Sequence, residues 1–253
     1  MTASLSILTF HALDHNPSVL SFRPDVFKRG LAKLHKSGYR TISLLEAVEC
    51  LRSKKPFPDQ CFVITFDDGY QTVYEVAFPV LQDLGMSATI FLAVGERERG
   101  KPEERLPSRE GRPMLNWKEI EEMKRCGMEF GAHTLTHPDL TRIPQKQMEA
   151  EICDSKKMIE NTLGAPVSSF AYPLGRYNDH IRDFIQHHFA CACSDHLGLM
   201  SATSDLYALQ RVDAYYLRTD RLFDLISTRC FPYYIGVRRI PRWIRRAVLN
   251  GLR

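Results

Sequence analysis

The sequence predicts a single α/β domain built on a mostly parallel sheet. Short apolar runs alternate with amphipathic segments along the chain, as they do in repeated strand–helix units. The 253 residues, 44% of them hydrophobic and 25% charged, are enough for one sizeable core. The pattern is not interrupted by a linker or an internal repeat, so one domain is favoured over two.

The apolar runs predict the strands, because each is short and bounded by turn residues. The predicted strands are residues 5–10, 61–66, 87–94, 128–132, 168–173, 189–194 and 207–212. The segments between them carry helical periodicity and helix-end signals, such as Ser43 and Glu46 in capping-box spacing. The predicted helices are residues 25–38, 43–53, 116–127, 145–163 and 179–188, with a further one that ends at Leu84. The charged connection 95–114 is predicted to be a mobile surface loop and a candidate lid.

Composition narrows the class of protein. The 34 basic and 30 acidic residues give a net charge of only +4, so no nucleic-acid partner is expected. The seven cysteines are odd in number and form no CxxC pair, which favours a reducing compartment. The first residues carry no basic region before a long apolar run, and no stretch approaches about 18 apolar residues. We therefore expect a soluble cytoplasmic protein.

Polar residues follow the predicted strands where ligands bind in parallel α/β folds. Asp67 and Asp68 follow strand 61–66, and His133 and His137 follow strand 128–132. Adjacent carboxylates repel each other, so the pair suggests two roles, one on a metal and one on a proton. The alternative is a plain Asp-Asp-Gly turn.

The two histidines, four residues apart, add metal-ligand chemistry. Two imidazoles and one carboxylate make a set that suits Zn²⁺ and leaves positions open for water and substrate. The alternative is that each histidine is an ordinary core or cap residue.

Three motifs together resemble one enzyme family. TFDDGY, HTLTHP and FAYPLG, in this order, resemble the polysaccharide deacetylase family with the NodB homology domain, carbohydrate esterase family 4. The resemblance covers roughly residues 5–215 and implies a distorted (β/α)7 barrel. It implies one divalent metal ion, with zinc first and cobalt or nickel as alternatives, and removal of N-acetyl groups from amino sugars. The FAYPxG form resembles a branch involved in exopolysaccharide and surface-glycan synthesis.

The resemblance also implies roles for individual residues. Asp67 matches the catalytic base, and the backbone N–H of Leu174 matches the oxyanion donor. Of the motif aromatics, Tyr70 and Tyr172 are expected near the substrate, and Trp117 is a further candidate for stacking on a sugar, although these rings could equally be core residues. The implied metal ligands are Asp68, His133 and His137.

The sequence departs from the family at two positions. Many members carry Arg where this chain has Ala171, and a late His that the stretch 209–215, LQRVDAY, lacks. Arg211 is our candidate to replace the arginine that holds the base; its alternative is a surface or interface ion pair. His11, which ends the first strand, is our candidate for the missing general acid; its alternative is a core histidine.

We therefore expect a metal-dependent hydrolase that deacetylates an amino sugar in a glycan or glycan precursor, such as a nucleotide- or lipid-linked sugar. Two alternatives remain: hydrolysis of another carbon–nitrogen bond, of the N-formyl or purine-degradation type, and a glycan-binding module without turnover. The oligomeric state is not predicted.

The last segment differs in character from the rest. We expect residues 1–232 to form the catalytic domain and residues 233–253 a basic amphipathic segment with six arginines and no acid. A helix from Pro241, with Trp243 on its apolar face, is typical of an interfacial membrane segment. We therefore expect peripheral contact through residues 238–253 with the inner face of the membrane. The alternatives are a helix packed on the barrel and a dimer contact.

Overall fold

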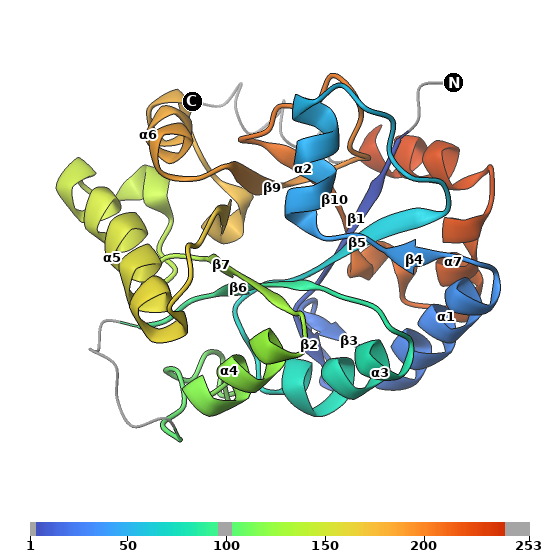
Figure 1. Cartoon of the computed structure of the whole chain (residues 1–253), viewed down its shortest axis with the longest axis horizontal. Coiled ribbons are helices and arrows are strands. Elements are labelled where there is room, and N and C mark those ends of the chain that lie inside the picture. The colour runs from blue at the N-terminus through green and yellow to red at the C-terminus, as the bar shows by residue number, and fades with distance from the viewer. Residues whose placement is uncertain (1–3, 96–102, 241–253) are drawn as a thin grey trace.

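In the described part of the chain, seven parallel strands close into a barrel (Figure 1). The computed structural model describes residues 4–95 and 103–240. The barrel strands are β1 (Ser6–Phe10), β5 (Cys61–Phe66), β6 (Thr89–Leu92), β7 (Glu129–Ala132), β8 (Ser169–Ala171), β9 (Cys191–Leu197) and β10 (Leu209–Asp213). They pair in that order, β10 pairs with β1, and every pairing is parallel. The expected (β/α)7 barrel is confirmed.

Shorter strands lie beside the barrel. β4 (Arg40–Thr41) pairs with the start of β5. β2 (Ala12–Leu13) and β3 (Ser21–Phe22) form a separate parallel pair in the connection after β1.

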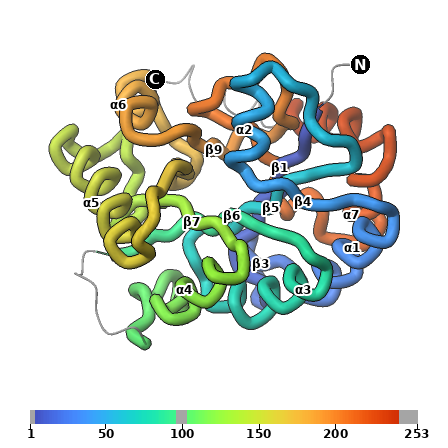
Figure 2. The backbone as a smooth tube through the Cα atoms, viewed as in Figure 1, coloured from blue at the N-terminus to red at the C-terminus, as the bar shows by residue number. Residues whose placement is uncertain are grey.

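Helices surround the strands, and α1 lies against α7 from the far end of the chain (Figures 1 and 2). They are α1 (Pro24–Lys36), α2 (Leu44–Arg52), α3 (Phe78–Asp83), α4 (Trp117–Arg125), α5 (Gln145–Leu163), α6 (Asp179–His188) and α7 (Asp220–Asp224). Shorter helical turns span Val73–Ala77, Leu140–Arg142, Pro173–Gly175, Ala214–Leu217 and Leu225–Ser227. Residues 231–240 are also helical.

Cap residues place several of these helices as the sequence predicts. Ser43 accepts a hydrogen bond from the Glu46 N–H, and Asn116 forms a complete capping box with Glu119. Gly164 ends α5 in the left-handed conformation, with φ of 60°. The helix expected before Leu84 begins only at Val73, because the residues after β5 form a turn.

Side chains of the barrel strands alternate between two cores. Leu8 and Ile64 point outward and pack against the surrounding helices, whereas Ile7 and Val63 point into the barrel, in a cluster that α2 helps to close. The inward positions become polar toward the ends of the strands. The hydroxyls of Thr9 and Thr65 lie 2.9 Å apart, and the next inward position on the β5 side is Asp67. The barrel therefore delivers Asp67 to its carboxyl-terminal mouth.

Residues 103–114 correct the prediction of a mobile surface loop. Leu106 is buried in the outer core, and its N–H donates to the Leu115 carbonyl. The Leu115 N–H in turn donates to the carbonyl of Gly69. The few apolar residues here are scattered among charges, so hydropathy alone does not reveal their burial. Residues 96–102 of the predicted loop and lid lie outside the described residues.

The helix at residues 231–240 begins before Pro241, where the sequence analysis placed its start. It buries Phe231 and Ile235 against the outer core. Residues 241–253, which carry most of the predicted membrane segment, lie outside the described residues. In the part of the chain that the structure describes, no helix combines the length and apolar character needed to cross a bilayer.

Candidate active site

The predicted ionisable site residues gather at the carboxyl-terminal mouth of the barrel. Thr9 of β1 lies beside Thr65 of β5, so His11 and Asp67, each two residues further on, reach the same edge. His11 Nε2 lies 3.9 Å from Asp67 Oδ2, and only 20% of the His11 side chain is exposed. His133 follows β7 at this edge.

Asp67 and Arg211 form a buried, two-point ion pair. Arg211 Nη1 and Nη2 donate to Asp67 Oδ1 and Oδ2, each at 2.7 Å. Arg211 Nε also donates to the Ser194 carbonyl at 3.0 Å, which fixes the guanidinium in the barrel interior. The alternative of a surface ion pair is wrong, because Arg211 is only 5% exposed.

This pair determines the charge of Asp67. Burial by itself would raise the pKa of the carboxyl, but the Arg211 charge and its two hydrogen bonds outweigh burial and hold that pKa well below its usual value. Asp67 is therefore an oriented carboxylate at neutral pH.

Asp68 turns away from its neighbour into a cluster with the two histidines. Asp68 and Gly69 have φ of 72° and 89°, so the Asp-Asp-Gly stretch is indeed a turn. The turn places Asp68 Oδ1 3.6 Å from His133 Nε2 and 3.4 Å from His137 Nε2. The residues of the turn therefore also contribute to a cluster that could hold a metal ion.

The cluster fits a divalent metal ion. One ligand atom from each of the three residues lies within 4.8 Å of the others. Ligands of tetrahedral zinc lie about 3.4 Å from one another, given bonds of about 2.0–2.2 Å. Asp68 Oδ1 is buried and has no hydrogen-bond partner, which is costly unless another group satisfies it.

Both imidazoles are in the neutral form that a metal ligand requires. His133 Nδ1 lies 2.7 Å from the Ala171 carbonyl, so Nδ1 carries the proton and the Nε2 lone pair faces Asp68. Burial lowers the pKa of His133, and burial together with the neighbouring His133 lowers the pKa of His137 to about 3.

Glu151, which the sequence analysis did not single out, organises the loop between the histidines. Its Oε2 accepts hydrogen bonds from the N–H groups of Leu135 and Thr136, both at 2.9 Å, and its Oε1 accepts one from the Thr136 hydroxyl. Thr134 Oγ1 accepts the His137 N–H. These bonds hold a loop in which Thr134 and His137 both have positive φ. The sequence around Glu151 does not indicate this role, because an acid within a helix is common and its contact with the loop depends on how α5 packs.

Arg109 is a second residue that sequence reasoning missed. Its Nε lies 3.6 Å from Asp68 Oδ1, the same oxygen that both imidazoles face. Arg109 belongs to the connection expected to be a surface loop, in which Leu106 is also buried.

The predicted aromatic residues lie in the core instead of the open mouth. Tyr70 and Tyr172 are each 1% exposed and Trp117 is 4% exposed, so none presents a free ring face. The Tyr172 hydroxyl donates to the Tyr207 carbonyl. These three residues are therefore core residues in the structure, as the alternative predicted. Stacking on a sugar would require their rings to move. Leu174, by contrast, follows β8 with φ of 58° and is 53% exposed.

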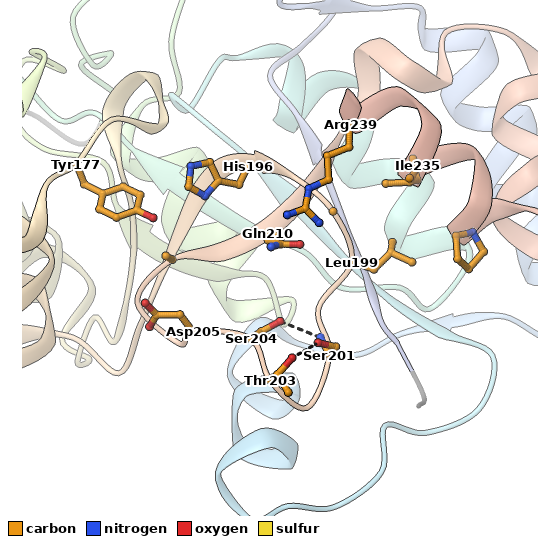
Figure 3. A pocket seen from close by; sticks show the side chains of 14 residues that line it. Tyr177, His196, Leu199, Ser201, Thr203, Ser204, Asp205, Gln210, Ile235 and Arg239 are labelled. Carbon is orange, nitrogen blue, oxygen red and sulfur yellow. Dashed lines mark hydrogen bonds between the residues drawn. The ribbon is translucent and has the colours of Figure 1, made fainter. Parts of the chain in front are cut away.

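A separate hollow of about 550 Å³ lies beside β9 and β10 (Figure 3). Gln210, the neighbour of inward-pointing Arg211, lines it, together with Tyr177, His196 and Arg239. Because strand side chains alternate, this hollow is on the outer wall of the barrel. It holds none of the predicted site residues.

Known proteins resemble this chain over most of its length. The family model described as polysaccharide deacetylase matches residues 54–188. YxkH of Bacillus subtilis (strain 168), assigned to the polysaccharide deacetylases, is 30% identical over 214 residues, which are 83% of this chain and 71% of YxkH. The poly-beta-1,6-N-acetyl-D-glucosamine N-deacetylase of Staphylococcus aureus (strain MRSA252) is 30% identical over 137 residues, 51% of this chain and 45% of that enzyme.

Solved structures show the same fold. The Streptococcus pyogenes deacetylase PplD, determined in complex with acetate, superposes with a TM-score of 0.75 at 29% identity. The superposition covers 84% of this chain and 93% of PplD. IcaB from Ammonifex degensii has a TM-score of 0.72 at 22% identity, a likeness of fold.

Proposed function

The chain belongs to the polysaccharide deacetylase family, and we propose that it removes N-acetyl groups from amino sugars in a polysaccharide or glycan precursor. Family membership makes it a hydrolase of carbon–nitrogen bonds. The observation that carries the proposal is the ionised Asp67, fixed by Arg211, beside the cluster of Asp68, His133 and His137. The pairing places a proton acceptor next to a set of metal ligands.

Asp68, His133 and His137 would hold one divalent ion, with zinc the first choice and cobalt or nickel as alternatives. A bound ion of this kind would lower the pKa of a water molecule toward about 7 and polarise the acetamide oxygen. The neutral imidazoles and the unsatisfied Asp68 Oδ1 support this assignment.

Asp67 would accept the proton of the attacking water. Arg211 fixes both carboxylate oxygens, so the group is oriented before the substrate arrives. The same arginine makes Asp67 a weak base, because it stabilises the ionised form. Arg211 is therefore a positioning residue: it fixes the orientation of the Asp67 carboxylate and at the same time lowers the basicity of that carboxylate.

Two further groups complete the proposed machinery. The backbone N–H of Leu174 would donate to the developing oxyanion, since Leu174 follows β8 at the mouth. His11 would protonate the leaving amine, because its Nε2 lies beside Asp67. If His11→Ala leaves both turnover and the alkaline limb of the pH profile unchanged, His11 does not have this role.

The geometry bears on one of the two alternatives. A glycan-binding module without turnover is suggested by the missing family arginine and the missing late histidine, but Arg211 holds Asp67 at two points, which argues against this alternative. Hydrolysis of another carbon–nitrogen bond, of the N-formyl or purine-degradation type, would use the same groups and differ only in substrate.

The test is acetate release by the metal-stripped protein reloaded with Zn²⁺, Co²⁺ or Ni²⁺. The panel contains N-acetylated oligosaccharides, nucleotide sugars and lipid-linked sugars, with N-formyl compounds and purine-derived amides as competitors. We expect metal-dependent acetate release from at least one saccharide, at a rate about 10²–10⁴-fold lower in Asp67→Asn. If only the N-formyl compounds or the purine-derived amides are hydrolysed, the protein is a hydrolase of another carbon–nitrogen bond and the proposal is wrong.

The cellular setting is part of the proposal. A cytoplasmic enzyme acting on a nucleotide- or lipid-linked sugar, with peripheral membrane contact through residues 238–253, remains our prediction. The panel distinguishes these substrates directly, because a carrier-linked sugar should be preferred over the free oligosaccharide.

A further inference from the structure

Tyr215 is an exposed aromatic ring that the surrounding residues hold in place. It is 47% exposed, and its backbone N–H donates to Asp213 Oδ1 at 2.8 Å. The Arg218 guanidinium lies 4.2 Å from the ring centroid, and Tyr216 contacts the ring edge-on at 5.4 Å between centroids. The ring is thus supported by two neighbours while almost half of the residue remains open to solvent.

Arg218 connects Tyr215 to the connection after β1. Its Nη2 lies 3.2 Å from the carbonyl oxygens of Ser18 and of Val19, and it donates to both. Ordering a long side chain costs conformational entropy, and an exposed cation–π contact returns only about 0.5–1 kcal/mol. A supported ring that is almost half exposed is a candidate contact surface for a ligand.

The strand register places Tyr215 at the mouth of the barrel. Thr9 of β1 pairs with Asp213 on one side and with Thr65 on the other. Two residues further along, β1 and β5 reach His11 and Asp67, whereas β10 ends at Asp213 and the helical turn Ala214–Leu217 carries Tyr215 at the same end of the barrel. Neighbouring strands lie about 4.8 Å apart, so the ends of β10 and β5 are on the order of 10 Å apart along the rim.

An open hollow lies beside Arg218, the residue that supports the ring. It has a volume of about 650 Å³, and Arg218 forms part of its wall together with the connection after β1. The residues that line it are Asp14, His15, Asn16, Pro17, Ser18, Val19, Ser21, Arg23 and Arg218. Charged and polar side chains such as Asp14, Asn16 and Arg23 can hydrogen-bond sugar hydroxyls.

We propose that Tyr215, backed by Arg218, is a stacking platform for a sugar ring next to the one being deacetylated. This inference rests on the proposed function and deepens it, since it predicts that the substrate is a chain of sugars, whether free or attached to a carrier. One face of a pyranose ring presents C–H groups, which pack against an aromatic face. A pyranose with its glycosidic oxygen spans about one strand spacing, so one or two sugars match the separation between the ends of β5 and β10. Binding energy from this remote sugar then raises the affinity for longer chains.

Acetate release as a function of chain length tests the platform. The substrates are N-acetylglucosamine oligosaccharides from the monosaccharide to the pentasaccharide, and the variants are Tyr215→Ala and Tyr215→Trp. We expect Tyr215→Ala to lower kcat/KM about 10-fold on the longer substrates, mostly through KM, and to leave the monosaccharide unchanged. Tyr215→Trp should retain the preference for length. His35→Ala, which removes an exposed ring from α1, is the control and should change neither.

Direct binding separates this inference from the proposed function. Titration of the same saccharides into the full-length protein, followed by calorimetry, needs no turnover. Weaker binding of long saccharides by Tyr215→Ala supports the platform even if no acetate is released, in which case only the proposed function fails. Equal losses on the monosaccharide and pentasaccharide would show a structural role, and equal binding by wild type and Tyr215→Ala, or binding by neither, overturns the platform. Thermal unfolding of each variant checks that the fold is intact.

Discussion

At the scale of single residues, the two adjacent carboxylates have different partners, and this explains how they coexist. Arg211 neutralises Asp67, while Asp68 faces two neutral imidazoles and Arg109. Asp67 therefore has a counter-ion in Arg211, and Asp68 faces a position where a metal ion could supply the positive charge. The repulsion that made the pair conspicuous in the sequence is relieved by groups that are far away along the chain.

We expect Asp67→Asn to have two separable effects. The rate should fall about 10²–10⁴-fold, because the proton acceptor is lost, while metal binding is retained. The free energy of unfolding should also fall, by about 3–5 kcal/mol, because Arg211 is left buried without its counter-ion. Urea unfolding and metal content measured on the same preparation report both effects.

A double variant separates stability from catalysis. Asp67→Asn combined with Arg211→Met removes both charges and should recover most of the lost stability without restoring the rate. Recovery of the rate would contradict the assignment of Asp67 as the base. If Asp67→Asn loses the metal and Asp68→Asn keeps it, the roles of the two acids are reversed.

The metal assignment predicts a specific loss in His133→Ala. Removing this buried imidazole deletes one of three ligands, so most of the bound metal and of the activity should disappear. His35→Ala, which removes an exposed histidine from α1, should change neither. Metal content after loading and dialysis is the measurement. Full metal occupancy in His133→Ala combined with His137→Ala would exclude the site.

At the scale of elements, α5 contributes to the site without supplying a ligand. Glu151 accepts three hydrogen bonds from Leu135 and Thr136 and so holds the loop that carries His137. The length and end of this helix were predicted from periodicity and Gly164. Its functional contact was not, because which face meets the loop depends on packing between elements.

Glu151→Ala should therefore weaken metal binding about 10–100-fold, the usual effect of losing a group that orients a ligand. Glu151→Gln should weaken it less, because its amide oxygen still accepts one of the N–H groups. Asp154→Ala, an exposed acid on the same helix, is the matched control. The dissociation constant for Co²⁺, measured in competition with a chelator, reports the effect, and its visible spectrum reports the ligand geometry. Equal constants for Glu151→Ala and Asp154→Ala would leave Glu151 a purely structural residue.

Several elements show where sequence reasoning stops. Strands such as 61–66 could be predicted because continuous apolar runs bounded by polar residues are typical of buried strands. The structure of the described part of connection 95–114 could not be predicted, because the burial of Leu106 and the position of Arg109 depend on contacts with distant residues. Arg211 was named as a candidate, but its two-point contact with Asp67 is a property of the closed barrel.

At the scale of the whole molecule, barrel closure brings the site together. Pairing of β10 with β1 places Arg211 across from Asp67, and the pairings through β6 and β7 bring His133 to the same mouth. The alternation of strands and helices predicted a parallel sheet but left an open and a closed sheet equally possible. The family resemblance, and not the periodicity, predicted the closed form.

The last prediction concerns the helix at residues 231–240 and the basic segment that follows it. On this helix Tyr233, Val237 and Ile240 are 79%, 49% and 56% exposed, and their spacing of four and three residues places them on one face. Phe231 and Ile235 are buried against the outer core. One face of the helix is thus packed on the barrel, as the alternative to a membrane segment predicted. Another face is apolar and exposed beside Arg238 and Arg239.

We expect the full-length chain to sediment with vesicles that contain anionic lipid, and a chain truncated at Arg239 to sediment much less. Each arginine near an anionic surface contributes about 1 kcal/mol, and the truncation removes four of the six in residues 238–253. Raising the salt concentration should release the full-length protein, because these contacts are screened. Tyr233→Ser combined with Val237→Ser in the full-length chain should reduce binding in neutral and anionic vesicles alike, since it removes apolar contacts. Equal sedimentation of the full-length and truncated chains, or none by either at low salt, would exclude the membrane contact and leave a helix that only packs on the barrel.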